Sequence, residues 1–447
     1  MARRHGRALL SAIAALIVGL SATLYAVAAS GTGTAGHRGG SADGRGPHPS
    51  ADPPSTGVWA TSWAASPSGA EPGTGTTGMA GRSVRNVVHT SVGGTRARIT
   101  LSNLYGTRPL TVTDATVAVA AGGGGASADA GTLRRVTFDG GSTRVVIPAG
   151  QRAVSDAVPV PVPDDGDVLV TTYSPASSGP VTYHRYARQT SYAAVGDRAA
   201  DPDGSAYTER TPFWRYLTAL DVLGHEAEGT VVVFGDSITD GMTATSDADR
   251  RWTDVLADRL RTAADAGQDV PRYGVVNAGI SGNRVLVDGL GQPPENPSGL
   301  HRFSRDVLGR AEVRVVVIDL GVNDILRPPL PPAAGTVLDG LRTLVRQAHA
   351  RGVKVVGATL TPFGGHRGGT PDREAVRQQV NAAIRAGGVY DAVVDFDAAL
   401  RDPRDPRRLL PRHDCGDHLH PGDAGYRAMG EAFDLAVLKG AAPPAAL

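Results

Sequence analysis

A serine, a histidine and a carboxylate in this chain have the residue types that nucleophilic acyl transfer requires. Ser237 ends a Gly-Asp-Ser sequence that follows an unbroken apolar run, and Asp417 precedes His420 by three residues. A serine hydroxyl is a weak nucleophile until a base accepts its proton, and histidine is the usual base near neutral pH. A carboxylate beside that histidine holds its tautomer and stabilises the imidazolium. We therefore expect Ser237 to be the nucleophile, His420 the base and Asp417 its partner.

Two further motifs contain donors for the negative charge that develops during such a reaction. Gly282 lies in an Ile-Ser-Gly-Asn sequence and Asn323 in a Gly-Val-Asn-Asp sequence. The backbone N–H groups of Ser237 and Gly282 and the side-chain amide of Asn323 would together form an oxyanion hole. Gly282 lacks a Cβ, so the backbone there can approach a substrate closely. Taken singly, each motif is also compatible with a turn or a helix cap, and only the set points to catalysis.

The chain after residue 230 alternates between apolar runs and amphipathic stretches. The apolar runs predict β-strands at 231–236, 275–280, 313–320, 353–360 and 392–396. The amphipathic stretches predict helices at 252–263, 336–350, 373–385 and 424–438. Val-rich strands that alternate with helices are typical of a parallel sheet covered on both faces. Ligands of such sheets bind at the carboxyl ends of the strands, which is where Ser237, Gly282 and Asn323 follow theirs.

The order of these motifs resembles that of the GDSL-type SGNH hydrolases over roughly residues 230–438. The matching positions are the Gly-Asp-Ser block at 235–237, Gly282, the Gly-Val-Asn-Asp block at 321–324, and Asp417 with His420. The residue after Ser237 is Ile238 where the family name has leucine, which exchanges one apolar side chain for another. The resemblance implies a flavodoxin-like three-layer α/β/α parallel sheet and ester hydrolysis by serine, without a metal or other cofactor.

Neighbouring residues compete for some of these roles. His418 is a second candidate base, but His420 has the better spacing from Asp417 for the pairing. Gly279 is a second candidate oxyanion glycine, which we interpret as a strand-end residue, and Asp236 is expected to order the turn after the first strand. A cluster of possible metal ligands comprises His413, Asp414, Cys415, Asp417, His418 and His420. Its spacings match no structural zinc pattern, so we expect no metal there.

The first half of the chain has a different pattern, which predicts an all-β sandwich over residues 57–229. Short alternating segments are broken by Gly, Pro and Asp, and hardly any stretch has helical periodicity. The runs at 87–92 and 95–102, joined by Gly93-Gly94, predict a β-hairpin. Further strands are predicted at 111–119, 143–147, 167–173 and 216–222. With an SGNH catalytic domain at 230–440, the chain would contain two globular domains.

The aromatic side chains of the first half allow two interpretations. The segment 59–67, with Trp at both 59 and 63, resembles one that precedes the SGNH domain in secreted actinobacterial hydrolases. The rings in question are those of Trp59, Trp63, Tyr183 and Trp214. They could stack on carbohydrate, or they could lie in the core of the sandwich or against the catalytic domain. The second interpretation is favoured because buried aromatic rings dominate the energetics of cores.

The N-terminus predicts export from the cytoplasm. A basic start up to Arg7, an apolar stretch over residues 8–29 and a small-x-small sequence at 26–28 describe a signal peptide in residues 1–29. The stretch is also long enough to remain as a membrane anchor. Residues 30–56 are rich in Gly, Ser and Pro and predict a disordered linker. Cys415 is the only cysteine, which excludes an intramolecular disulfide.

Composition limits the class of function. The net charge of +1 over 447 residues argues against a nucleic-acid binder, and the aromatic content of 5% argues against a large apolar binding surface. We expect an exported, monomeric serine esterase acting on short acyl esters, with acetyl groups on polysaccharide as one substrate class. The alternatives are a phospholipase or lipase-type acylhydrolase and a non-catalytic carbohydrate-binding surface protein that keeps the fold. The loops at 289–299, 327–334 and 401–412 are expected to shape the pocket.

Overall fold

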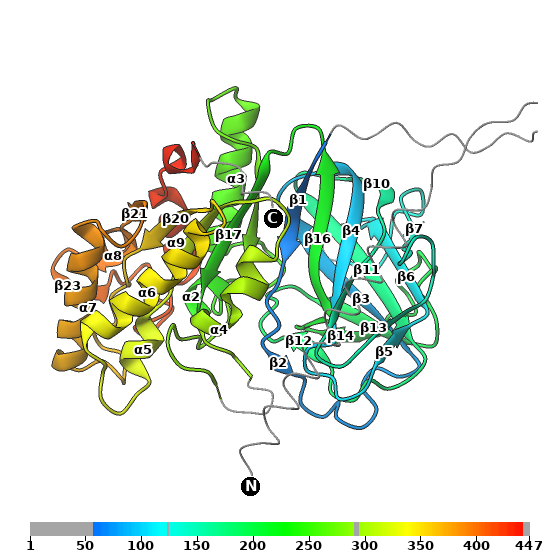
Figure 1. The fold of residues 1–447 in the computed structure, drawn as a ribbon, viewed down its shortest axis with the longest axis horizontal. Helices are drawn as coiled ribbons and strands as arrows, with labels where there is room; N and C mark the ends of the chain where they lie inside the picture. The colour runs from blue at the N-terminus through cyan, green and yellow to red at the C-terminus, as the bar shows by residue number, and fades with distance from the viewer. Residues whose placement is uncertain (1–56, 123–124, 290–294, 441–447) are drawn as a thin grey trace, which may run out of the picture. The chain divides into compact units, whose positions relative to one another are not determined.

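The computed structural model describes residues 57–122, 125–289 and 295–440. The signal or anchor segment and the linker expected in residues 1–56 lie outside these ranges. Figure 1 shows that antiparallel strands dominate the chain before residue 229 and that strands and helices alternate after it. Within the described ranges, the structure contains no helix that is both long and apolar enough to span a bilayer.

A five-stranded parallel sheet carries the second half of the chain. Its strands are β17 (Gly229–Gly235), β18 (Tyr273–Asn277), β19 (Val313–Asp319), β20 (Lys354–Ala358) and β21 (Ala392–Val394), in the spatial order β18-β17-β19-β20-β21. Counted from β17 this order is 2-1-3-4-5, as in flavodoxin-like doubly wound sheets. The parallel α/β arrangement predicted for this half is therefore confirmed, with all five predicted strands in place.

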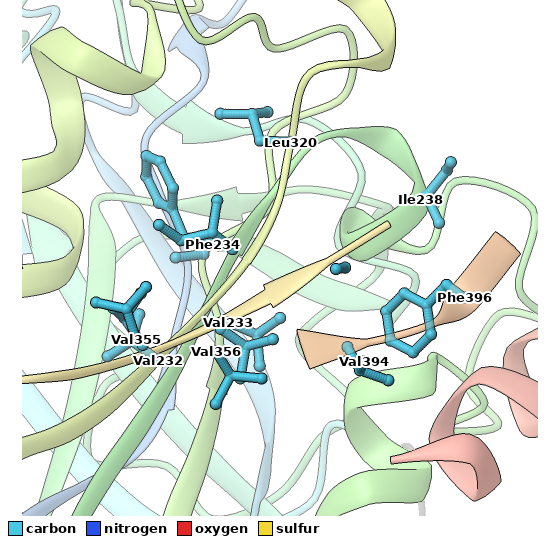
Figure 2. Packing of buried hydrophobic residues seen from close by; sticks show 14 of the residues in the cluster. Val232, Val233, Phe234, Ile238, Leu320, Val355, Val356, Val394 and Phe396 are labelled. Carbon is cyan, nitrogen blue, oxygen red and sulfur yellow. The ribbon is translucent and has the colours of Figure 1, made fainter. Parts of the chain in front are cut away.

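The helices of this half form two packed groups. In one group α3 (Trp252–Asp265) and α8 (Phe396–Leu400) contact α9 (Asp423–Ala432), and in the other α6 (Ala334–His349) contacts α4 (Gly299–Phe303) and α7 (Pro371–Arg385). The path along the sheet reverses direction after β18, so right-handed crossovers place the two groups on opposite faces. Between them, Val232, Val233 and Phe234 of β17 and Val355 and Val356 of β20 belong to one apolar core, with β19 lying between the two strands (Figure 2).

The last predicted helix is shorter than the sequence pattern indicated. A single helix was expected over 424–438, but α9 ends at Ala432 and a separate 3₁₀ turn, η2, spans Leu435–Leu438. The side chain of Asp434 accepts a hydrogen bond from the N–H of Ala436 at 2.9 Å. Aspartate competes with the helix backbone in this way, so Asp434 starts a new turn where the periodic pattern predicted continuation.

Two large antiparallel sheets make up most of residues 57–229, which confirms the strand-rich prediction for this region. One has the order β1 (Val58–Ala64), β16 (Leu217–Gly224), β4 (Gly94–Ser102) and β10 (Val158–Val162), with β9 (Arg152–Val154) also pairing with β4. The other has the order β14 (Glu209–Thr211), β13 (Ser191–Val195), β3 (Arg82–Thr90), β11 (Gly166–Ser174), β6 (Asp114–Val119) and β7 (Arg134–Arg135). Three smaller strands, β15 (Trp214–Arg215), β12 (Thr182–His184) and β2 (Gly69–Ala70), form a further sheet. Apolar side chains of both large sheets meet in one buried cluster.

The predicted hairpin between 87–92 and 95–102 is wrong. The two runs form β3 and β4, which belong to different sheets and do not pair with each other. Neither Gly93 nor Gly94 has the positive φ that a two-residue hairpin turn of this kind requires. A Cβ at Gly93 would lie 2.6 Å from the carbonyl oxygen of Val162, and one at Gly94 would lie 2.7 Å from that of Leu223. The two glycines therefore allow close contact between backbones where the chain passes from one sheet to the other.

The aromatic rings of residues 57–229, which we call the β region, are mainly buried. Trp63, Tyr183 and Trp214 are buried, and the rings of Trp63 and Trp214 meet edge to face at 4.8 Å. The indole N–H of Trp214 donates to the carbonyl oxygen of Val87 at 2.8 Å. The core interpretation is confirmed for these three rings. Trp59 is half-buried, with the guanidinium of Arg98 over its face.

The β region packs against the edge of the parallel sheet. The N–H of Thr61 on β1 donates to Thr230 Oγ1 at 2.9 Å, and the N–H of Val275 on the edge strand β18 donates to Ser91 Oγ at 3.0 Å. An exposed sheet edge offers unpaired backbone groups to other chains. The β region covers this edge and satisfies part of its hydrogen-bonding capacity.

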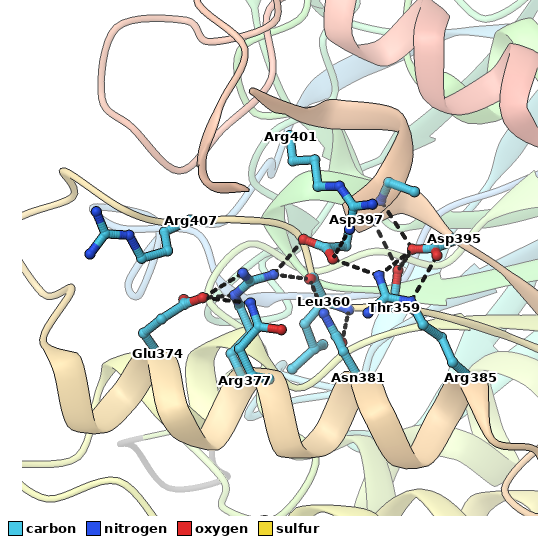
Figure 3. A network of polar contacts seen from close by, with 12 residues as sticks. Thr359, Leu360, Glu374, Arg377, Asn381, Arg385, Asp395, Asp397, Arg401 and Arg407 are labelled. Carbon is cyan, nitrogen blue, oxygen red and sulfur yellow. Dashed lines mark hydrogen bonds and ion pairs between the residues drawn. The ribbon is translucent and has the colours of Figure 1, made fainter. Parts of the chain in front are cut away.

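A buried ion network fastens α7 to the far end of the sheet (Figure 3). The Arg377 side chain is 0% exposed and donates to Asp397 Oδ1 at 2.6 Å and to the carbonyl oxygen of Leu360 at 3.0 Å. Its remaining donors meet the carboxylate of Glu374. Arg385 contacts the second oxygen of Asp397, so that one carboxylate joins two arginines of the same helix.

Replacing Arg377 with methionine should lower the free energy of unfolding by about 3 kcal/mol, because it leaves part of a buried ion network without its partner. Urea unfolding of the two proteins measures this difference. Arg342→Met is the matched control, since Arg342 pairs with Asp339 at the exposed surface of α6. Exposed ion pairs of this kind contribute roughly 0–1 kcal/mol to the free energy of unfolding. Equal effects of the two substitutions would contradict the importance of the buried network.

Candidate active site

The end of β17 presents Ser237 at the start of a short helical turn. After Gly235 the chain enters α2 (Ser237–Asp240), and Asp236 Oδ1 caps this turn by accepting a hydrogen bond from the N–H of Ile238 at 3.1 Å. The expectation that Asp236 orders this turn is confirmed. The pKa of the Asp236 carboxyl is raised well above its usual range by burial and by the neighbouring carboxylate of Asp319.

Ser237, His420 and Asp417 form a continuous hydrogen-bonded chain. His420 lies just before α9, and its Nε2 is 2.8 Å from Ser237 Oγ. On the other side of the ring, Nδ1 is 2.5 Å from Asp417 Oδ2. The second oxygen of Asp417 accepts the backbone N–H groups of Leu419 and His420. Ser237 and His420 are 5% and 8% exposed, so both are largely shielded from solvent.

The environment of Asp417 keeps its carboxylate ionised at neutral pH. Burial alone would raise the pKa of this group, but the hydrogen bond with His420 and the two backbone N–H donors lower it to about 2. An ionised carboxylate on Nδ1 favours the tautomer of His420 whose Nε2 can accept a proton from Ser237. The geometry and charge therefore suit a serine activated by a histidine base.

The amide of Asn323 is held in one orientation from both ends. Asn323 lies in α5 (Val322–Leu326), where its Nδ2 donates to Asp236 Oδ2 at 3.2 Å and its Oδ1 accepts from Arg327 Nε at 3.0 Å. Because Oδ1 accepts the hydrogen bond from Arg327, Nδ2 is fixed as the donor beside the Gly-Asp-Ser turn. An amide nitrogen carries two hydrogens, so one remains for an oxyanion.

Gly282 lies in the loop after β18, which runs against the end of β17. The N–H groups of Ala278 and Ile280 in this loop donate to the carbonyl oxygens of Val233 and Gly235. Gly282 has a φ of 78°, a conformation that favours glycine. The structure therefore gathers the loops of all five predicted site residues around the carboxyl ends of β17, β18 and β19.

The competing assignments find other roles. His418 Nδ1 is 2.6 Å from Asp414 Oδ2 and is not paired with Asp417. The N–H of Gly279 donates to Asn277 Oδ1 at 2.9 Å, so it is already engaged. In the C-terminal cluster, Asp414, Cys415 and Asp417 bring possible ligand atoms within 4.8 Å of one another. Burial and the nearby carboxylate of Asp417 raise the pKa of the Cys415 thiol.

Sequence reasoning missed Arg327 as a member of the site and placed it only in a pocket loop. Besides its bond to Asn323, its guanidinium lies so close to Gly282 that a Cβ there would be 2.4 Å from Nη2. The available signal was its spacing, because residues four apart share one face of a helical turn. Of the other predicted pocket loops, 289–299 falls partly outside the described residues. The loop at 401–412 contains the short antiparallel strands β22 (Arg401–Asp402) and β23 (Asp405–Leu409).

Comparison with known proteins finds one family that is similar to the part of the chain containing these residues. A sequence model of the GDSL-like Lipase/Acylhydrolase family matches residues 233–428, a span that includes Ser237, Gly282, Asn323, Asp417 and His420. This part of the chain is therefore similar to the GDSL-like lipases and acylhydrolases, and the match supports a carboxylic ester hydrolase of that type.

Similar solved structures cover just under half of this chain. One is a GDSL-like lipase from Bacteroides thetaiotaomicron VPI-5482, which is 19% identical in sequence and has a TM-score of 0.34. The match covers 48% of this chain and 88% of that lipase. A carbohydrate acetylesterase family member from Sinorhizobium meliloti has 19% identity, coverage of 46% and 96%, and a TM-score of 0.35. An acetyl xylan esterase has 20% identity, coverage of 45% and 96%, and a TM-score of 0.34. No curated protein sequence matches the chain.

Proposed function

We propose that this protein is an exported serine esterase that hydrolyses short-chain acyl esters through an acyl-Ser237 intermediate. The observation that carries the proposal is the hydrogen-bonded chain from Ser237 Oγ through His420 to the ionised Asp417, at 2.8 and 2.5 Å. The oriented amide of Asn323 lies beside it. A protein that only binds carbohydrate has no use for this combination of nucleophile, base and oriented donor.

The reaction follows from the geometry in two half-reactions. Ser237 Oγ attacks the ester carbonyl carbon while His420 Nε2 takes the hydroxyl proton. The resulting oxyanion accepts hydrogen bonds from the N–H groups of Ser237 and Gly282 and from Asn323 Nδ2. Collapse of this intermediate breaks the bond to the alcohol oxygen, which receives the proton from His420. Water then gives a proton to His420 and attacks the acyl-Ser237 carbonyl, and the released acid leaves Ser237 protonated.

The limited exposure of the nucleophile supports a small acyl group. Ser237 is 5% and His420 8% exposed, so the acyl carbon must enter a restricted space. Acetyl esters on polysaccharide fit this restriction, because the bulky part of the substrate can remain outside. The basic and apolar N-terminal sequence supports export. The net charge of +1 supports a neutral substrate rather than a nucleic acid.

An ester panel tests the proposed substrate class. For p-nitrophenyl esters of increasing acyl length, kcat/KM should be highest for acetate or butyrate and fall by about tenfold or more for octanoate, since a misfit of about 1.4 kcal/mol is tenfold in rate. Acetylated xylan and pectin in the same panel identify the alcohol. A preference for long acyl chains would favour the phospholipase or lipase alternative. A folded wild-type protein that hydrolyses no ester would favour the carbohydrate-binding alternative.

A further inference from the structure

The tripeptide Ser281-Gly282-Asn283 is held in place by side chains from outside the parallel sheet. Gly282 is its central residue and carries the proposed oxyanion N–H. Both of its neighbours are bound by groups that lead back to the β region at residues 57–229. These contacts form two separate routes, one through Asp240 and one through Arg302 and Asn296.

The first route is a buried ion pair that crosses between the two halves of the chain. Asp240 Oδ2 accepts hydrogen bonds from the backbone N–H of Ser281 at 2.9 Å and from its Oγ at 2.6 Å. Asp240 Oδ1 lies 2.9 Å from Nε2 of His184, and the two side chains are 3% and 5% exposed. On the other side of the imidazole, Nδ1 is 2.8 Å from the carbonyl oxygen of Ser66. His184 and Ser66 both belong to the β region.

The partners of His184 indicate its protonation state. A carbonyl oxygen can only accept a hydrogen bond, so Nδ1 must carry a hydrogen, and a carboxylate on Nε2 calls for a second one. Burial would lower the pKa of His184, but the carboxylate of Asp240 outweighs it, so the net shift is upward. The same carboxylate therefore holds both the buried imidazole ring of His184 and Ser281.

The second route binds the opposite side of the tripeptide. Arg302 is 1% exposed and donates from Nε to Asn283 Oδ1 at 2.9 Å and from Nη1 to Ser66 Oγ at 3.2 Å. Asn296 donates from Nδ2 to the carbonyl oxygen of Ser281 at 3.0 Å. The backbone N–H of Asn296 in turn donates to the carbonyl oxygen of Ser68 at 3.0 Å. Residues 66–68 of the β region thus anchor both routes.

We propose that His184 of the β region is a positioning residue for the oxyanion hole, acting on Gly282 through Asp240 and Ser281. This inference rests on the proposed esterase function. Oxyanion donors act only at the position that the developing charge will occupy, and a displacement of about 1 Å can cost 10²-fold in rate. The β region is then part of the scaffold that the reaction requires, and the hydrolase half depends on it for the geometry of Gly282.

Kinetics of His184→Gln in the full chain test this role. The substitution should lower kcat for p-nitrophenyl acetate by about 10- to 100-fold and change KM less than about twofold, because the donors are displaced mainly from the transition-state oxygen. The inhibition constant of phenylboronic acid, which forms a tetrahedral adduct with serine, should rise by a similar factor. Ser281→Ala is the second variant, to be used if His184→Gln fails to fold. It removes only the Oγ contact with Asp240 and should lower kcat by about tenfold or less.

A matched control separates positioning from general loss of stability. His89 on β3 also forms a pair across the two halves, with Asp249 at 3.5 Å, but its other ion-pair partners, Asp165 and Asp167, lie in the β region and not in the tripeptide. His89→Gln should leave kcat and the affinity for phenylboronic acid unchanged even if the melting temperature falls. A value of kcat for His184→Gln within twofold of the wild type, at normal boronate affinity, overturns the inference.

Hydrogen exchange distinguishes failure of this inference from failure of the proposed function. In His184→Gln, exchange at the amides of residues 281–283 should be faster by at least about tenfold than in the wild type, whatever the activity, since the anchoring pair is lost. His89→Gln should show wild-type exchange there. If the wild type hydrolyses no ester but its amides at residues 281–283 still exchange more slowly than those of His184→Gln, only the proposed function is contradicted. Unchanged exchange in His184→Gln contradicts the positioning role alone.

Discussion

Replacing Ser237 with alanine should lower kcat for p-nitrophenyl acetate by about six orders of magnitude, as loss of the nucleophile does in other serine hydrolases. Replacing His420 with alanine should cost about as much, because an unactivated serine hydroxyl attacks esters poorly. The two residues are joined by a hydrogen bond of 2.8 Å, and we expect them to act as one unit. The double variant should therefore be no slower than either single variant.

Steady-state kinetics with far-ultraviolet circular dichroism as the folding control measure these losses. Thr243→Ser serves as the matched control, since its hydroxyl donates to the carbonyl oxygen of Pro421 near the same turn and the substitution keeps that donor. It should retain activity within a few-fold of the wild type, because the hydrogen bond to Pro421 is kept. Substantial residual hydrolysis by folded Ser237→Ala would show that another group attacks the ester.

The second large effect is expected at Asn323. Asn323→Ala should lower kcat by about 10²- to 10³-fold and leave KM nearly unchanged, because the amide meets the oxygen mainly when it becomes an oxyanion. The substitution also removes the donor to Asp236, so a loss of stability of about 1–3 kcal/mol should accompany it.

Asn103→Ala controls for this loss of stability. Asn103 is a buried amide of the β region whose Nδ2 donates to the carbonyl oxygens of Arg108 and Ile147. Its replacement should destabilise the protein comparably but leave kcat unchanged. If folded Asn323→Ala retained kcat within a few-fold of the wild type, Asn323 would have no part in the oxyanion hole.

The parallel sheet was predictable because its signal is local. Val231 to Phe234 form an uninterrupted apolar run that is 0% exposed in the structure, and Val315 to Ile318 of β19 repeat this pattern. A run of this kind can only be accommodated where both faces of a strand are covered. Ser237 and Asn323 follow such strands directly, so their placement at one edge of the sheet could be inferred without knowledge of long-range contacts.

The errors occur where a local pattern has two physical uses. Gly93-Gly94 has the composition of a hairpin turn, but its glycines serve close backbone contacts with residues that lie far away in the sequence. Asp434 occupies a helical position in the periodic pattern, yet its side chain caps a separate turn. In both cases the deciding partner or competing hydrogen bond is invisible to periodicity.

The support around the site could not be predicted, because its contacts join distant parts of the chain. His184 contacts Asp240 across 56 residues, and Arg302 contacts Ser66 across 236. Nothing in the pattern around His184 distinguishes it from an ordinary histidine of a β-strand. Arg327 is the exception, since its position four residues after Asn323 was a signal within one helical turn.

Covalent labelling followed by peptide mass spectrometry tests the identity of the nucleophile most directly. A fluorophosphonate is attacked by an activated serine oxygen with loss of fluoride, which leaves a phosphonyl group on that oxygen. The wild type should carry one phosphonyl group, on Ser237, and lose its esterase activity in proportion to labelling. Ser237→Ala and His420→Ala should remain unlabelled. Inactivation of the wild type with the label on another residue, or complete labelling of Ser237 with activity retained, would contradict the account.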